Sequence, residues 1–410
     1  MGKSKRKALL GVLIIVLLVG SIGLFMKNET NTLNSNSIKE GITKELDDNL
    51  IGAYIQQGEE YVKADTIPTS GYEFNAEESY CKIGDVVQEE MTLFYDMDTQ
   101  TLTVSPIAKE GTKCYLYFDE QASAGETILA SDNPPTGQTT DWTGGTTYYY
   151  TENPNNWVQF GGFYWRIIRI NGDGSIRMIY QGTSANTTGT GTQLYTVAFN
   201  LLDDDNAYVG YMYTENQVHG TGSSSTIKGA LDQWYSGTSG LTAYAEYIDG
   251  NAGFCGDRTP YSGSGIGGGI SLRTYYAAYN RLVNNNNPSL QCSDSGDIYT
   301  TSGSSTGNGA LTYPIGLISA DEVVLAGLPY YDNGSNTNNY LYTGQLYWTM
   351  SPYNFYGGGT YEFVVYGNGS LYGYQADFRR GGARPVINLK ADTPISGSGT
   401  TTDPFKVAGT

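Results

Sequence analysis

The sequence is poor in charge and almost without histidine, and both shortages exclude broad classes of function. Only 16% of the residues are charged, and 41 acidic residues against 23 basic ones give a formal net charge of −18. Such an acidic body argues against binding nucleic acid or anionic lipid by bulk electrostatics, so no nucleic-acid partner is expected. The chain also carries no P-loop, dinucleotide fingerprint or HExxH motif.

The single histidine, His219, leaves little material for nucleophilic catalysis, which needs a nucleophile activated by a base. A G-x-S-x-G pattern occurs at 303–307, but it lies in a Gly/Ser-rich loop. A nucleophile elbow requires a strand before this pattern and a helix after it, and its histidine comes later in the chain. Non-catalytic function is therefore the first expectation.

Paired carboxylates hydrolyse glycosides without histidine, so a carboxylate-dependent, glycosidase-like surface hydrolase remains the enzymatic alternative. The available residues are Asp203, Asp204, Asp205, Asp232, Glu246 and Asp257. Sequence does not show which of them converge. The run Asp203, Asp204 and Asp205 is also a weak calcium candidate, because hard cations need clustered oxygen ligands. An acidic surface turn is the simpler interpretation, and no other cofactor or metal is expected.

The four cysteines include no CxxC pair, which argues against a zinc site or a redox motif. In an exported protein the default is two disulfides. Of the three connectivities, Cys81–Cys114 with Cys255–Cys292 is favoured because each pair falls in one half of the chain.

The N-terminus predicts export. Residues 8–26 form an uncharged, mostly apolar run that as a helix spans roughly 28 Å, close to the hydrocarbon core of a bilayer. Lys3, Lys5, Arg6 and Lys7 precede it, so the positive-inside rule predicts a cytoplasmic N-terminus and a single-pass anchor in the cell membrane. The body would then be extracellular. The rival interpretation is a cleaved signal peptide and a secreted protein.

Composition and patterning divide the rest of the chain. The predicted segments are a transmembrane signal-anchor at 1–26, a helical stalk at 27–68, a small disulfide-stapled β domain at 69–120, a linker at 121–150, an α+β domain at 151–392 and a C-terminal tail at 393–410. The stalk is predicted to be helical because apolar residues recur at three- or four-residue steps from Ile38 to Tyr61. Residues 121–150 are predicted to be a linker because they are rich in Gly, Thr, Ser and Pro.

Residues 347–389 organise the last domain. They are predicted to form three strands joined by glycine turns, with two aromatic and arginine-rich loops at 353–359 and 375–382. Upstream, the run 171–174 (NGDG) is a strong hairpin signal between 158–170 and 175–182. Residues 223–235, 241–248 and 271–283 are predicted helices, and Ser319 with Glu322 forms a capping box for another.

The motifs Trp348–Pro352, Val365–Gly369 and Arg384–Leu389, with Val158–Arg177 upstream, resemble the signature of an uncharacterised domain family. That family is common in surface and secreted proteins of Gram-positive gut bacteria. The segments STIKGALDQWY, FCGDR and YPIGLISADEVVLAG also resemble it, and the match covers roughly residues 150–392. The family has no established activity, so the resemblance implies a fold rather than a function. The order of elements is remotely similar to C-type-lectin-like domains, which implies a β-rich α+β fold.

Tyrosine, present 36 times, is the most suggestive positive feature. Its ring offers stacking area and its hydroxyl a hydrogen bond at low entropic cost, which suits glycan or protein recognition. The predicted ligand-binding residues are Tyr353, Phe355, Tyr356, Tyr372, Tyr374, Arg379 and Arg380. Ordinary packing is the alternative for each tyrosine, whereas Arg384 is predicted to be a structural residue paired inside the fold.

The expected function is therefore cell-surface recognition or adhesion, with a glycan, a cell-wall polymer or a protein as ligand. A structural envelope protein without a discrete ligand is the third alternative, beside the hydrolase.

Overall fold

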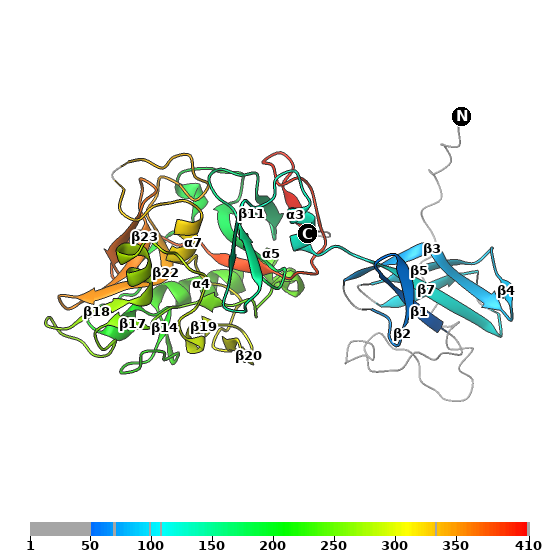
Figure 1. Cartoon of the computed structure of the whole chain (residues 1–410), viewed down its shortest axis with the longest axis horizontal. Coiled ribbons are helices and arrows are strands. Elements are labelled where there is room, and N and C mark those ends of the chain that lie inside the picture. The colour runs from blue at the N-terminus through cyan, green and yellow to red at the C-terminus, as the bar shows by residue number, and fades with distance from the viewer. Residues whose placement is uncertain (1–50, 69–70, 98–99, 107–108, 333, 408–410) are drawn as a thin grey trace. The chain divides into compact units, whose positions relative to one another are not determined.

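The computed structural model describes residues 51–410 except 69–70, 98–99, 107–108, 333 and 408–410. The chain divides into two units, residues 1–122 and 123–410 (Figure 1). The predicted anchor and the first part of the predicted stalk lie outside the described residues. Within the described part of the chain, no helix is long and apolar enough to cross a membrane.

The first unit is all β. A five-stranded sheet has the order β2-β1-β7-β3-β4, and a separate hairpin is formed by β5 and β6. The bounds are β1 (Ile51–Gln57), β2 (Glu60–Ala64), β3 (Tyr72–Ile83), β4 (Val86–Val87), β5 (Thr92–Asp96), β6 (Thr101–Ser105) and β7 (Thr112–Glu120).

Strand β7 is the central strand of the five-stranded sheet, because it pairs with β1 on one side and with β3 on the other. Its side chains from Thr112 to Asp119 alternate between buried and half-buried. Leu116 and Phe118 are fully buried, and Phe118 contacts the rings of Phe74 and Tyr95. Cys81 of β3 stands opposite Cys114 of β7 and forms the predicted disulfide with it. So small a core gains from such a cross-link.

The predicted helical stalk is wrong where the structure describes it, because residues 51–64 form β1 and β2. Strand β1 pairs with β7 in parallel, from Ile51 opposite Cys114 to Ile55 opposite Phe118. Gly58, at φ +67°, provides the turn to β2. This pairing partner lies some sixty residues away, and it overrides a local spacing of apolar residues that resembles a helix. The β unit therefore begins before residue 69.

The second unit contains two larger sheets. The eight-stranded sheet has the order β26-β12-β11-β10-β28-β27, with β9 and β8 added beside β11. Its bounds are β8 (Gly137–Thr140), β9 (Thr146–Tyr149), β10 (Trp157–Phe160), β11 (Phe163–Ile170), β12 (Ile176–Gly182), β26 (Val386–Leu389), β27 (Ile395–Ser396) and β28 (Phe405–Val407). The predicted hairpin is confirmed, because β11 and β12 pair across residues 171–175.

The seven-stranded sheet has β22 at its centre, flanked by β18 and β23 and touched in parallel by β25. Its bounds are β13 (Thr196–Val197), β17 (Pro260–Ser262), β18 (Arg273–Tyr276), β22 (Tyr347–Tyr356), β23 (Gly359–Val365), β24 (Leu371–Gln375) and β25 (Gly381–Gly382). Short pairs complete the unit: β14 (Met212–Tyr213) with β15 (Ser223–Ser224), β16 (Phe254–Cys255) with β19 (Ile298–Tyr299), and β20 (Gly303–Ser304) with β21 (Gly307–Asn308).

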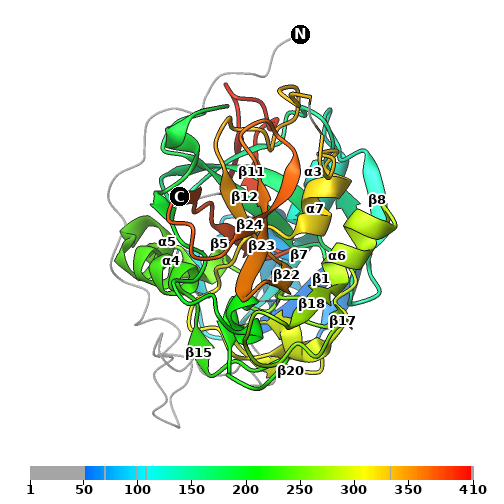
Figure 2. The same ribbon diagram turned by 90° about the vertical axis from the view of Figure 1, so that its left-hand side faces the viewer.

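Helices lie on both flanks of β22, β23 and β24, with α4 and α5 on one flank and α6 and α7 on the other (Figure 2). The bounds are α3 (Ala124–Leu129), α4 (Thr226–Gly237), α5 (Ser239–Ala243), α6 (Ala277–Tyr279) and α7 (Ala320–Leu325). Single turns are η1 (Thr190–Thr192), η2 (Asn206–Val209), η3 (Ala245–Tyr247), η4 (Asn280–Asn284) and η5 (Ser295–Asp297). Both capping boxes, at Ser123 and at Ser319, satisfy the first amides of their helices.

The third predicted helix, at 271–283, is wrong over its first six residues and helical from Ala277 on. Residues 273–276 form β18, which pairs with β17 and β22, and helical geometry begins only at Ala277. The run Arg-Thr-Tyr-Tyr has the β-branched and aromatic residues that suit a strand beside another strand. In contrast, the predicted helix at 223–235 is present as α4, and the Ser225 hydroxyl caps it by accepting the Lys228 amide.

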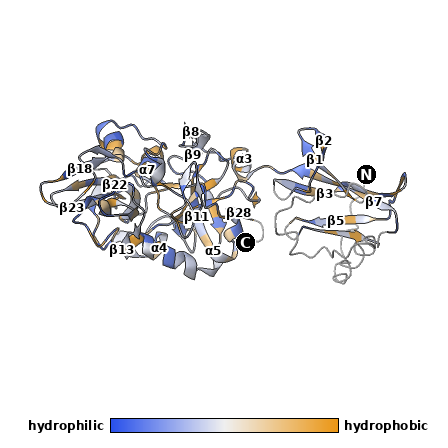
Figure 3. Cartoon of the chain, turned by 90° about the horizontal axis from the view of Figure 1, so that it is seen from below, coloured by the Kyte–Doolittle hydropathy of each residue, from blue (hydrophilic) through white to orange (hydrophobic). Residues whose placement is uncertain are grey.

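Both ends of the second unit extend beyond the predicted boundaries. The predicted linker contains α3, β8 and β9, with Ala124 and Ile128 fully buried in the main core. The predicted tail supplies β27 and β28, and β28 pairs with β10 while burying Phe405 and Val407. The strands around β11, like β5 in the first unit, carry hydrophobic residues (Figure 3). The β-rich α+β class is confirmed.

Candidate functional site

The predicted ligand-binding residues do not lie together in the structure. Residues 353–356 are not a loop but the last part of β22, which turns at Gly357 and Gly358 into β23. Phe355 is fully buried, so its assignment as a ligand-binding residue is wrong. Tyr353 is half-buried, and it packs against Phe363 at 4.9 Å between ring centroids. It also shares a 2.8 Å hydrogen bond with the hydroxyl of Tyr330.

The remaining predicted residues lie at different places on the surface. Tyr356 is exposed and stands under the guanidinium of Arg273, at 4.6 Å. Tyr374 packs on Phe378 at 4.4 Å. Tyr356 pairs with Gly359, whereas Tyr372 pairs with Val364, so the two exposed tyrosines stand roughly 16 Å apart along the strands.

Arg379 and Arg380 are both exposed and follow the end of β24.

One predicted residue belongs to a surface that sequence did not reveal. Tyr372 stands between Tyr331 and Tyr366, with ring centroids 5.3 Å and 6.3 Å away. The three side chains, which we call the tyrosine platform, are 56%, 45% and 40% exposed for Tyr331, Tyr366 and Tyr372 respectively. They come from the segment after Leu328, the end of β23 and the start of β24. Neighbouring exposed aromatic rings without a covering element are unusual on a soluble surface.

Backbone hydrogen bonds hold the platform in place. The Tyr331 amide donates to the Leu371 carbonyl at 3.0 Å, and the Leu371 amide donates to the Pro329 carbonyl at 2.8 Å. Asn368 then locks the turn of the β23–β24 hairpin to the neighbouring loop, because its side-chain amide donates to the Asp332 and Gly334 carbonyls. The hairpin and the loop are thus one pre-organised support.

Tyr331 has φ +48°, in the left-handed region that bulky residues rarely adopt. Strain of this kind costs roughly 1–2 kcal/mol and persists only where the surroundings impose it. Here it directs an exposed ring toward Tyr372. The sequence signal was present but weak: Pro329-Tyr330-Tyr331-Asp332 ends in turn residues, and nothing in it shows that it meets 366–372.

A second candidate is a buried group of charges around helix α7. Arg281 donates through one nitrogen, Nη2, to Asp257 at 2.5 Å and to Asp321 at 2.8 Å. Glu322 accepts the guanidinium groups of Arg169, at 3.0 Å, and of Arg177, at 2.6 Å. These contacts join β11, β12, α7 and the segment after β16 in one network.

Mutual pairing fixes the charge states in this network. Burial alone would raise the pKa of Glu322, but the charges of Arg177 and Arg169 outweigh it and lower that pKa. Burial likewise opposes the charge of Arg281, but Asp321 and Asp257 raise its pKa further above the usual value. At Asp321 burial outweighs Arg281 and raises the pKa. Each of these charges nevertheless lies against an oppositely charged partner.

The cavity beside this network has a volume of about 20 Å³ and is lined by side chains that include Trp142, Ser289, Gln291 and Ser351. Such a space holds about one water molecule, far less than a sugar ring requires. Asp257 and Asp321 do converge, which a hydrolase would need. Because both are bonded to Arg281 in so small a cavity, the arrangement is that of a structural ion network.

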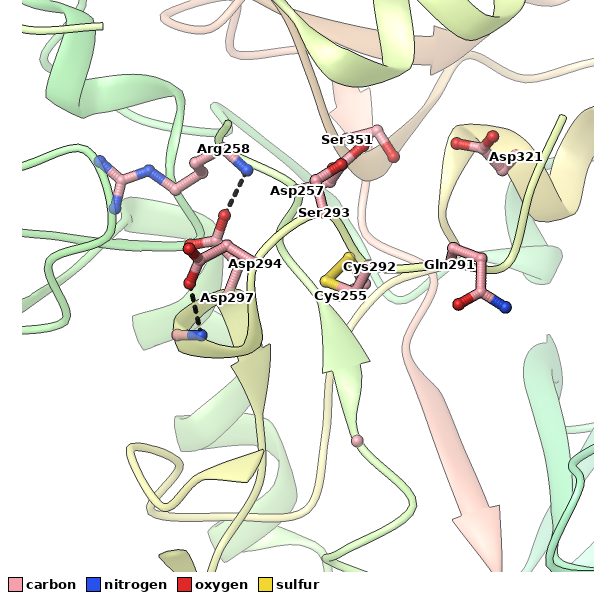
Figure 4. The surroundings of a disulfide bond; sticks show 12 residues. Cys255, Asp257, Arg258, Gln291, Cys292, Ser293, Asp294, Asp297, Asp321 and Ser351 are labelled. Carbon is pink, nitrogen blue, oxygen red and sulfur yellow. Dashed lines mark hydrogen bonds between the residues drawn. A yellow bond between two sulfur atoms is a disulfide. The ribbon is translucent and has the colours of Figure 1, made fainter. Parts of the chain in front are cut away.

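The second predicted disulfide, Cys255–Cys292, is confirmed, and its Cys255 lines the same cavity. Its neighbourhood is acidic, with Asp257 beside it and Asp297 accepting the Arg258 amide at 2.5 Å (Figure 4).

The other sequence candidates do not gather. Asp203 accepts from Gln375 and Asp205 caps η2, while Asp232 pairs with Lys228 at 2.6 Å. Glu246 is exposed on η3. Across the described residues, no group of three or more His, Cys, Asp or Glu side chains is placed to hold a metal ion. The Asp203, Asp204 and Asp205 run is therefore not a preformed calcium cage.

His219 is also placed away from any nucleophile elbow. Its Nδ1 lies 3.0 Å from Asp297, and this hydrogen bond raises the pKa of His219 despite partial burial. The G-x-S-x-G pattern at 303–307 forms the exposed β20–β21 hairpin, not a strand-to-helix turn. Arg384, in contrast, is buried as predicted and donates to the Tyr180 carbonyl and to Gln181.

The chain matches no protein-family model, and no curated protein and no solved structure is significantly similar to it. The geometry above is therefore the basis for assigning function.

Proposed function

We propose that the second unit is a non-catalytic recognition domain of the bacterial cell surface that binds a glycan, such as a cell-wall polymer, through the tyrosine platform. The observation that carries this is the set of three exposed rings, Tyr331, Tyr366 and Tyr372, within 5.3–6.3 Å of the central one. One face of a pyranose ring is lined by C–H groups, and it stacks on an aromatic ring as other apolar surfaces do.

The surroundings favour a glycan over a flat protein surface. Asp332 is exposed beside Tyr331, and the half-buried Asn336 lies in the same loop. Carboxylate and amide groups next to stacked rings match the hydroxyl groups at the edge of a sugar. The support is also pre-organised, which reduces the entropy lost on binding.

The proposed family and location are consistent with this function. The signature segments form the centre of the unit: 158–177 contains β10 and β11, Trp348–Pro352 lies in β22 and Arg384–Leu389 contains β26. We propose membership of the surface-protein family and a lectin-like topology on that support. The two disulfides support an exported body, and the basic N-terminus followed by an apolar run supports a membrane anchor.

The test is a screen of cell-wall polymers and host-type glycans against the full chain in mild detergent. We expect Tyr372→Ala to weaken binding of the detected glycan at least tenfold, because Tyr372 contacts both other rings. Tyr261→Ala is the matched control: Tyr261 is 56% exposed, as Tyr331 is, but lies on β17. Its binding should equal that of the wild type.

A second variant separates function from packing. Tyr331→Gly should bind the glycan at least tenfold more weakly and yet unfold at the same or a higher temperature, because glycine relieves the left-handed strain. Binding unchanged in both variants would refute the platform as the site. No glycan bound at all, or a protein ligand retained by both variants, would refute the proposed function.

A further inference from the structure

One end of the second unit exposes apolar side chains that no element of the described residues covers. The loop between β17 and β18 and the turn between β22 and β23 together present four of them, which we call the apolar tip: Ile266, Ile270, Leu272 and Tyr356. Ile270 is 81% exposed. β17, β18 and β23 form this end of the unit, at the left of Figure 1.

The tip is held in one conformation rather than being loose. The amide and side chain of Asn206 both donate to the Gly267 carbonyl, at 3.1 Å and 2.6 Å, and Asp205 pairs with Gly268. On the other side, Ile270 lies directly over Gly358, where a Cβ would stand only 3.1 Å from its side chain. Apolar side chains displayed on a fixed support indicate an interaction surface.

The border of the tip is acidic. Asp203 and Asp204 precede the Asp205–Gly268 contact, and Asp377 follows the end of β24. Burial first, and then the nearby Asp377 and Asp204, raise the pKa of Asp203. Among the described residues none of these three carboxylates takes part in an ion pair. The Arg273 guanidinium lies over Tyr356, so the negative charge without an ion-pair partner lies on the Asp203, Asp204 and Asp377 side of the tip.

We propose that the apolar tip docks a cationic amphipathic segment of a partner protein, with apolar side chains over Ile270 and Leu272 and Lys or Arg against Asp203, Asp204 and Asp377. Charge selects this occupant. A second copy of a chain with net charge −18 would bring two acidic borders together, and an anionic lipid surface would be repelled in the same way. The proposal is independent of glycan binding.

The test uses a fluorescent 14-residue amphipathic peptide of Leu and Lys, with a Leu/Glu peptide for comparison. Binding to the immobilised full chain is measured in one mild detergent, so that any background from micelles is common to all variants. We expect the double variant Ile270→Ser, Leu272→Ser to weaken binding at least tenfold without any change of charge. Val86→Ser, at a 65% exposed residue of the first unit, is the matched control and should bind normally.

The acidic border is tested separately. Asp203→Asn with Asp204→Asn should weaken binding and reduce its dependence on salt. Ile270→Ser alone serves if the double variant is less stable, because its side chain is almost entirely exposed. The proposal is overturned if the serine variants bind as the wild type does, or if the Leu/Glu peptide binds equally well. Binding of phosphatidylcholine vesicles instead, or a dimer that Ile270→Ser dissociates, would also overturn it.

Discussion

At the scale of one residue, Glu362 places a carboxyl group without a hydrogen-bond partner among the described residues in the core of the second unit. Its side chain lies in the middle of β23, fully buried, and neither carboxyl oxygen has a hydrogen-bond partner among the described residues. Burial raises its pKa well above the usual value, although the charge of Arg258 opposes this. A buried carboxyl without a partner is held neutral because ionising it would be far more costly.

Glu362→Gln should therefore stabilise the protein in a pH-dependent way. Below about pH 4.3 the carboxyl is protonated in both states, so variant and wild type differ little. Above that pH the unfolded chain ionises while the folded chain keeps its proton, and the wild type loses stability until the raised pKa is reached. Across this window the advantage of the variant should grow by about 1.4 kcal/mol per pH unit.

Denaturant unfolding at several pH values between 4 and 8 measures this difference. Glu246→Gln, at an exposed residue, is the control and should show no such trend. A constant difference, or a loss of stability with rising pH, would show that Glu362 is paired or ionised in the folded protein.

At the scale of elements, α7 depends on Glu322 for more than its cap. The Glu322 side chain accepts the Ser319 amide at 2.8 Å and also compensates Arg169 and Arg177, which come from β11 and β12. The helix is short, with six residues, so its position depends on these contacts rather than on its own propensity.

Glu322→Gln should cost about 3–5 kcal/mol, because it leaves the buried Arg177 without an ion-pair partner among the described residues and Arg169 with only Asp141, at 3.8 Å. Ser319→Ala removes only the cap and should cost about 1 kcal/mol. Denaturant unfolding of the two variants distinguishes these effects. Equal losses would show that the cap, not the ion network, is what Glu322 contributes.

The elements that were predicted correctly from the sequence are those that depend on residues close together in the chain. The Asn171-Gly172 turn and the Ser319 capping box depend on residues within a few positions, and both are confirmed. The strands β1 and β18 were mistaken for helix because their partners, β7 and β22, are distant in the chain. Apolar spacing alone cannot reveal such partners.

The candidate site was less predictable for the same reason. Sequence selected Tyr372 because it follows a closing strand, but it also selected the buried Phe355. Tyr331 and Tyr366 join Tyr372 only through the hydrogen bonds that bring the loop after Leu328 to the turn at 366–370. Of the three residues of the tyrosine platform, the sequence therefore predicted only Tyr372.

At the scale of the whole molecule, the second unit is larger than the α+β domain that the sequence predicts at 151–392. Its core includes Ala124 and Ile128 before residue 151, and Phe405 and Val407 after residue 392. Strand β28 also covers the edge of β10, pairing Val158 with Phe405. An exposed strand edge promotes pairing with other chains, so this last strand protects the sheet from aggregation as well as completing its core.

A fragment of residues 123–410 should consequently fold alone, whereas residues 151–392 should not. Losing a buried phenylalanine typically costs about 3–5 kcal/mol, which already approaches the whole stability of many domains. The shorter fragment loses Phe405, Val407 and the packing of α3 together. Calorimetry should show one cooperative transition for 123–410, and for 151–392 either no transition or aggregation. A cooperative transition of the shorter fragment at the same temperature would mean that both end segments are dispensable to the fold.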